Sequence, residues 1–125
     1  MSLTLNFQEC KNISDYSLIT ISNALGFLKK LKEINLIYSN CEEITDRGTA
    51  PLIRSIISEK SRMLKMDFHN CNRLSEETLL IRKEALILSP GLVHLNLNFG
   101  ECTTLSDRGI EELKYGLMKL KNINF

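Results

Sequence analysis

Four cysteines recur along this chain of 125 residues at intervals of 30 or 31 residues, and each stands in the same local pattern. A fixed period of this length indicates stacked copies of one supersecondary unit, because each copy can bury its apolar face only against its neighbours. Aligned on the cysteines, the copies span about residues 1–30, 31–60, 61–91 and 92–119, and a partial copy spans 120–125. The repetition therefore predicts a single domain of consecutive, equivalent units.

The repeated pattern is clearest in the second and fourth copies. They read Leu31-x-x-Ile34-x-Leu36-x-Tyr38-x-x-Cys41-x-x-Ile44-Thr45-Asp46 and Leu92-x-x-Leu95-x-Leu97-x-Phe99-x-x-Cys102-x-x-Leu105-Ser106-Asp107. This pattern resembles the leucine-rich repeat in its long, cysteine-containing form, as in ribonuclease inhibitor and F-box receptors, and is most like the arrays of single-celled eukaryotes. The third copy departs from it, with Ser61 at the position of the opening leucine and with Glu76 and Thr78 in place of Asp-x-Gly.

The spacing of apolar residues changes within each copy. Leu95 and Leu97 alternate with asparagines, which predicts a short strand with one buried face. Leu18, Ile21 and Leu25 recur every three or four residues and predict an amphipathic helix. We therefore expect an α/β fold. The resemblance implies a leucine-rich-repeat solenoid, a curved right-handed β–α superhelix with a parallel sheet on its concave face and helices on its convex face.

Each helix is expected to begin at a serine–acid or threonine–acid pair, such as Thr45 with Asp46. These side chains can accept hydrogen bonds from the free N–H groups of their own helix, and the acid also suits the helix dipole. Gly48 and Gly109 follow in the first turn of two helices, where the lack of a side chain permits close contact with the preceding unit.

Composition excludes several classes of protein. A net charge of +1 gives no field that would attract nucleic acid, and no apolar run is long enough to cross a membrane. Without a secretory signal the cysteines are expected to be reduced, which favours an intracellular, cytoplasmic protein. We predict that all of the cysteines form a structural ladder directed into the core: Cys10, Cys41, Cys71 and Cys102.

The sequence contains few residues in arrangements suited to catalysis or metal binding. Its histidines are His69 and His94, and Asp67 and His69 are expected to share the solvent face of one strand, with His94 opening the next strand nearby. A catalytic or metal site would need a third placed group, and no phosphate-binding loop, nucleophile elbow or C-x-x-C pair is present. We therefore expect no enzyme, no catalytic residue, no metal and no cofactor.

Two surfaces are candidates for binding. The first is the amide-rich concave face, expected to carry Asn6, Asn35, Ile37, Lys65, Asp67, His69, Asn96, Asn98 and Asn124. The second is the outer side of the second and third helices, although a wide buried stripe explains its apolar residues better. Acidic residues gather where strands end and basic residues where helices end. Helix dipoles suffice to explain this sorting, but a basic rim could also hold an acidic partner.

The predicted function is that of a non-enzymatic protein-interaction module, a scaffold or subunit of a larger intracellular assembly. Partner proteins would bind the concave face or the open ends of the solenoid, with neither nucleic acid nor membrane insertion. The open ends predict either a piece of a longer array, which we favour, or ends covered by partners. By resemblance, the alternatives are the substrate-recognition repeats of an F-box-type ubiquitin ligase receptor and a small-GTPase regulator.

Overall fold

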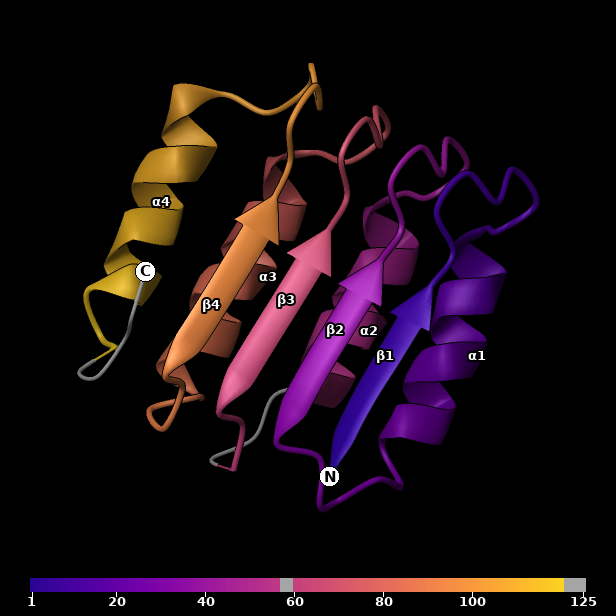
Figure 1. Ribbon diagram of the computed structural model, residues 1–125. Helices are drawn as coiled ribbons and strands as arrows, with labels where there is room; N and C mark the ends of the chain where they lie inside the picture. The colour runs from indigo at the N-terminus through magenta and orange to yellow at the C-terminus, as the bar shows by residue number, and fades with distance from the viewer. Residues whose placement is uncertain (57–59, 121–125) are drawn as a thin grey trace.

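The computed structural model describes residues 1–56 and 60–120, and in this part of the chain strands and helices alternate. In order, they are β1 (Ser2–Asn6), α1 (Asp15–Leu25), β2 (Glu33–Ile37), α2 (Asp46–Ile56), β3 (Met63–Asp67), α3 (Glu76–Ile87), β4 (His94–Asn98) and α4 (Asp107–Leu117). The strands pair in chain order and are all parallel. The helices lie together on one face of the sheet and leave the other face open (Figure 1). The predicted α/β class is confirmed.

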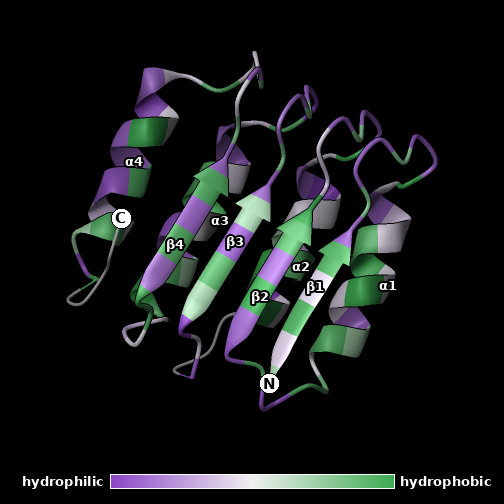
Figure 2. Ribbon diagram, in the orientation of Figure 1, coloured by the Kyte–Doolittle hydropathy of each residue, from purple (hydrophilic) through white to green (hydrophobic). Residues whose placement is uncertain are grey.

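Strand register repeats without a slip from one β–α unit to the next. Leu3, Ile34, Leu64 and Leu95 are successive partners in one column, and Leu5, Leu36, Met66 and Leu97 form another. Both columns face the helices, and their members are buried in β2 and β3 and half-buried in the outer strands. The strands accordingly carry alternating hydrophobic and hydrophilic bands (Figure 2). The predicted period-two strands are confirmed.

Aromatic rings continue the core beyond the ends of the strands. Phe7, Tyr38, Phe68 and Phe99 stack in order, with ring centroids 5.5, 5.5 and 6.1 Å apart. Tyr38 and Phe68 are fully buried. The Tyr38 hydroxyl has no hydrogen-bond partner among the residues that the structure describes. This position therefore combines good ring packing with an unpaired polar group.

The acids at the helix starts do not behave as expected. Asp15 Oδ1 accepts a hydrogen bond from the backbone N–H of Thr45 at 2.8 Å, and Asp46 Oδ1 accepts one from the N–H of Ser75 at 3.0 Å. Asp46 also accepts from the hydroxyls of Ser75 and Thr78. Each of these acids thus joins its own unit to the next unit instead of capping its own helix.

The expectation that a serine or threonine hydroxyl accepts a hydrogen bond from the start of its own helix is confirmed in two helices. Ser75 Oγ accepts from the N–H of Glu77 at 3.2 Å, and Thr45 Oγ1 accepts from the N–H of Arg47 at 3.3 Å. In the next unit, Ser106 donates its hydroxyl proton to the carboxylate of Glu76. The longer acid of the third unit therefore makes the same kind of link to its neighbour.

Close packing of the helix starts depends on glycine. A Cβ atom on Gly48 would lie 2.6 Å from Asp15 Oδ1 and 2.8 Å from Asp15 Cα. A Cβ atom on Gly109 would lie 2.6 Å from Cδ1 of Leu79. The predicted close contacts are confirmed, and the one at Gly48 is the more rigid because it includes backbone.

Replacing Gly48 by alanine is expected to lower the free energy of unfolding by about 1–3 kcal/mol, because the added methyl group must push α2 away from Asp15. Urea unfolding followed by circular dichroism measures the change. Gly26→Ala is the matched control, since its Cβ would meet the Asn23 carbonyl oxygen at an ordinary 3.5 Å. Equal stability of the two variants would contradict the close-packing account.

Replacing Tyr38 by phenylalanine is expected to raise the free energy of unfolding by about 1 kcal/mol, because the ring stays stacked and a buried, unpaired hydroxyl is removed. Burial also raises the pKa of Tyr38 above its ordinary value of 10.0. The protonated phenol is therefore favoured by folding, and the wild type should lose more stability than the variant as pH rises above this value. Thermal melts across alkaline pH would contradict the account if Tyr38→Phe were the less stable protein throughout.

Candidate functional site

The open face of the sheet presents two columns of side chains. Thr4, Asn35, Lys65 and Asn96 are successive register partners, and so are Asn6, Ile37, Asp67 and Asn98. Because alternate residues of a strand point to opposite faces, and the intervening residues face the helices, both columns face away from the core. The sequence prediction that these residues share one face is confirmed.

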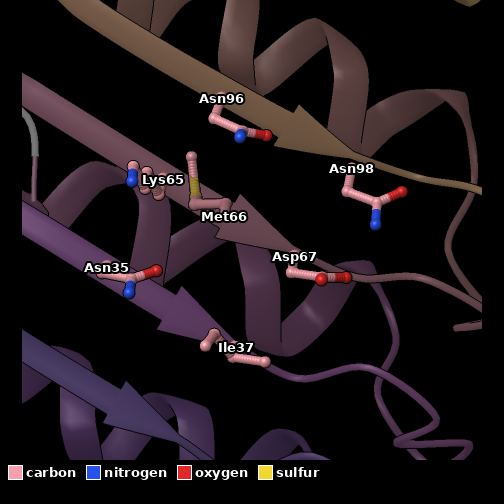
Figure 3. A pocket seen from close by; sticks show the side chains of 7 residues that line it. All are labelled: Asn35, Ile37, Lys65, Met66, Asp67, Asn96 and Asn98. Atoms are coloured by element: carbon pink, nitrogen blue, oxygen red, sulfur yellow. The ribbon is translucent and has the colours of Figure 1, made fainter.

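Within this face, side chains of β2, β3 and β4 surround a shallow depression of about 200 Å³. Its lining consists of Asn35, Ile37, Lys65, Met66, Asp67, Asn96 and Asn98 (Figure 3). We call this set of residues the open-face depression. Three amides, one cation and one carboxylate provide hydrogen-bond donors and acceptors, and Ile37 supplies apolar surface.

Side chains in one of the two columns also accept hydrogen bonds from the backbone of the turns after the strands. Asp67 Oδ1 accepts a hydrogen bond from the backbone N–H of His69 at 2.9 Å, and Asn98 Oδ1 accepts one from Gly100 at 2.9 Å. Asn6 does the same for Gln8 at 3.0 Å. These side chains therefore stabilise the turns that follow β1, β3 and β4. The sequence analysis missed this role, which the recurrence of Asn or Asp as the last strand residue indicates.

The described side chains of the other column make no such hydrogen bonds to the turns. The side chains of Asn35, Lys65 and Asn96 make no hydrogen bond or ion pair with any residue in the described ranges. They lie on three adjacent strands at one register position. Adjacent strands in a sheet are about 4.8 Å apart, so this row offers amide, ammonium and amide groups at regular spacing.

The histidines lie apart from the depression. His69 is not among its lining residues, and its imidazole packs over the turn after β4, where a Cβ atom on Gly100 would be 2.6 Å from its Nδ1. Its Nε2 is 3.8 Å from the Glu101 carboxylate. His69 thus lies next to Asp67, whose Oδ1 accepts its backbone N–H, but outside the lining of the open-face depression. Its assignment to the binding surface stays a prediction.

His94 opens β4, as expected, but lies far from Asp67. It pairs with Met63 at the beginning of the strands, whereas Asp67 is at the end of β3. Four residues of parallel strand correspond to about 13 Å, so His94 and Asp67 do not share a site. Asn124, the last residue predicted for the binding face, lies outside the described residues.

The cysteine ladder is present in three units. Cys41, Cys71 and Cys102 are buried, and their Sγ atoms lie 3.1, 3.2 and 3.1 Å from the carbonyl oxygens of Phe7, Tyr38 and Phe68 in the preceding unit. Burial raises the pKa of Cys41 and raises that of Cys71 to about 12, although the backbone hydrogen bonds act in the opposite direction. The thiols of Cys41 and Cys71 are thus protonated, structural groups.

Cys10 does not belong to the buried ladder, and its prediction as a core residue is wrong. It is exposed, whereas its three equivalents are buried. The reason is that no described segment packs against the first unit on the side where the later cysteines find a carbonyl oxygen. The cysteine position of the repeat is therefore buried where a preceding unit covers it and exposed in the first unit.

Thiol labelling should separate Cys10 from the other cysteines. In the native protein near pH 8, one thiol is expected to react at the rate of an exposed cysteine, while the buried thiols react slowly because they are shielded from the reagent. Cys10→Ser should remove the fast phase, and Cys71→Ser should leave it intact. Mass spectrometry of the labelled peptides identifies the residue, and a fast phase at Cys71 would contradict the buried ladder.

The apolar residues of the helices mostly serve the core. Leu52, Ile53 and Ile56 of α2 are buried, which confirms the wide buried stripe there, and Ile57 lies outside the described residues. In α3 the stripe is narrower, and Leu80 is 42% exposed. Ile87, the last residue of α3, and Leu88, which follows it, are also exposed.

Other kinds of site find no support in the described part of the chain. It contains no cluster of three or more histidine, cysteine, aspartate or glutamate residues that could hold a metal ion. Among the same residues, no helix has the length and apolar character needed to cross a membrane.

Comparison with known proteins identifies a related fold. No family model matches the sequence, and no curated protein gives a significant match. A solved structure of "Leiomodin-1 Actin-Binding Site 2 (ABS2)" is similar, with a TM-score of 0.69 and 15% sequence identity. The match covers 98% of this chain and 70% of that chain. The chain therefore shares its α/β fold with a structure to which its sequence bears little resemblance.

Proposed function

We propose that this chain is a leucine-rich-repeat array that serves as a non-enzymatic protein-interaction module, a scaffold or subunit of a larger assembly. Its binding surface is the open face of the sheet, centred on the open-face depression. The observation that carries the proposal is the row of Asn35, Lys65 and Asn96, whose polar groups face solvent at one register position of three adjacent strands.

The shape of the depression favours a protein ligand over a small molecule. Ligand pockets typically enclose about 300–1,000 Å³ and bury most of the ligand, whereas this depression is smaller and open. Amide groups on a flat surface can donate and accept hydrogen bonds with a partner backbone or side chains. Ile37 adds the apolar contact that the centre of an interface requires.

The rigidity of the surface supports the same function. The strands that carry these side chains are fixed by the buried columns beneath them and by helices packed on the other face. Side chains held on strands lose less conformational freedom on binding than side chains on mobile loops, so more of the contact energy contributes to affinity. The similar solved structure is by its name an actin-binding site, so a protein with this fold binds another protein.

Substitutions in the row should weaken binding of a partner captured from native cells and then purified. Asn35→Ala, Lys65→Ala and Asn96→Ala remove three central polar contacts, and at least one is expected to raise Kd about tenfold or more. Isothermal titration calorimetry measures the change, and actin should be included among the proteins tested.

Matched controls are available on the helices. Asn23→Ala in α1 removes an exposed amide, and Lys114→Ala in α4 removes an exposed ammonium group. Both should bind as the wild type does. If the helix variants lose as much affinity as the sheet variants, or if the sheet variants lose none, the proposed surface is wrong.

A further inference from the structure

A second surface lies at the edge of the sheet where the strands begin. There, Met1, Lys30, Lys32, Lys60 and Arg62 line a groove of about 540 Å³. We call these residues the basic groove. The four charged side chains that the described residues contribute to it are cationic, although the chain as a whole has a net charge of only +1. A local excess of one charge in an open groove raises the concentration of oppositely charged ligands there.

The repeat places these cations side by side. Lys32 donates its backbone N–H to the Met1 carbonyl oxygen at 2.9 Å, and Arg62 donates its backbone N–H to the Lys32 carbonyl oxygen at 2.8 Å. Lys32 and Arg62 therefore occupy equivalent positions on adjacent units. Lys30 and Lys60 precede them by two residues and end the first and second copies of the repeat. The result is two neighbouring pairs of cations along one edge.

Helix dipoles do not account for this cluster. The last turn of α1 contains no basic residue, and Lys30 follows the end of that helix at Leu25 by five residues. The effect of the dipole falls off within the last turn. The equivalent positions after α3 are occupied by Gly91 and Val93. The fold therefore does not require cations at these two positions of every unit.

The contacts of Arg62 and of the two lysines of the first strand connection differ. Arg62 Nη1 donates hydrogen bonds to the carbonyl oxygens of Ser61 and Gly91 at 3.3 and 3.2 Å, which orients the guanidinium group. Lys30 and Lys32 form no ion pair with a residue in the described ranges. Lys30 and Lys32 therefore contribute positive charge to the groove.

We propose that the basic groove binds an extended acidic segment of a partner protein, whose Asp or Glu side chains pair with Lys30, Lys32, Lys60 and Arg62. The volume exceeds what a single small anion would fill, and the cations are spread over three consecutive copies of the repeat. An extended peptide advances about 3.3 Å per residue, so carboxylates on alternate residues can reach successive cations. This surface is separate from the open-face depression, with which it shares no lining residue.

The test uses the complete chain with a synthetic oligoglutamate peptide and an oligoglutamine peptide of equal length. The oligoglutamate should bind, and its affinity should fall as salt is raised, while oligoglutamine should not bind. Replacing Lys30 and Lys32 together by glutamine should raise Kd by about two- to fivefold for each charge removed. Fluorescence anisotropy measures binding, and circular dichroism establishes that each variant is folded.

The matched control replaces Lys11 and Lys119 by glutamine, which removes two exposed charges outside the groove. It should retain the affinity of the wild type. Equal losses in both double variants would overturn the proposal, because attraction would then reflect net charge alone. Failure of oligoglutamate to bind would overturn it too.

Two further results would assign the groove to another ligand and so overturn the proposal. The first is inorganic pyrophosphate displacing the peptide completely while binding more tightly, which would indicate a small-anion site. The second is self-association in sedimentation equilibrium that is lost on replacing Lys30 and Lys32, which would make a second copy of the chain the occupant. A monomer that prefers the peptide to pyrophosphate supports the acidic segment.

Discussion

Hydrogen bonds between successive β–α units fix the register on which the rest of the structure depends. Asp46 holds both the backbone and the hydroxyl of Ser75, and the Cys71 thiol lies 3.2 Å from the carbonyl oxygen of Tyr38. Both links recur one unit away, at Asp15 with Thr45 and at Cys41 with Phe7. A thiol is a weak donor, so the cysteine link is individually small. Because the cysteine is buried, a shift of the preceding unit would nevertheless disturb the packing around it.

Constant register gives the open face its order. A slip by one residue between two strands would turn buried leucines outward and the polar row inward, at a large cost in buried apolar area. The row of Asn35, Lys65 and Asn96 is therefore as well defined as the core beneath it. In the neighbouring column, Asp67 and Asn98 use one oxygen for a turn and keep the rest of the side chain at the surface. Stability and surface chemistry are thus partly carried by the same residues.

The sequence predicted features that depend on periodicity, because a period constrains many positions at once. Alternation of Leu95 and Leu97 with asparagines identified the strand and its exposed face, and Gly48 was correctly expected at a close contact. The columns of the candidate site followed from the same alignment. Their binding function stays a proposal.

Features that depend on neighbours could not be read in the same way. Cys10 matches the other cysteines in sequence, but its exposure depends on what packs beside the first unit. Local capping rules assigned Asp46 to its own helix, whereas its strongest available partners lie in the next unit, 29 and 32 residues away.

The most direct test of the account is residue-resolved hydrogen exchange of the folded chain, measured alone and with a purified protein partner. In the free chain, the account predicts slowest exchange for β2 and β3, which have a paired strand on both sides. With the partner, added protection should appear in β2, β3 and β4 around the open-face depression. Added protection confined to α1–α4, with the strands unchanged, would contradict the claim that the open face of the sheet is the binding surface.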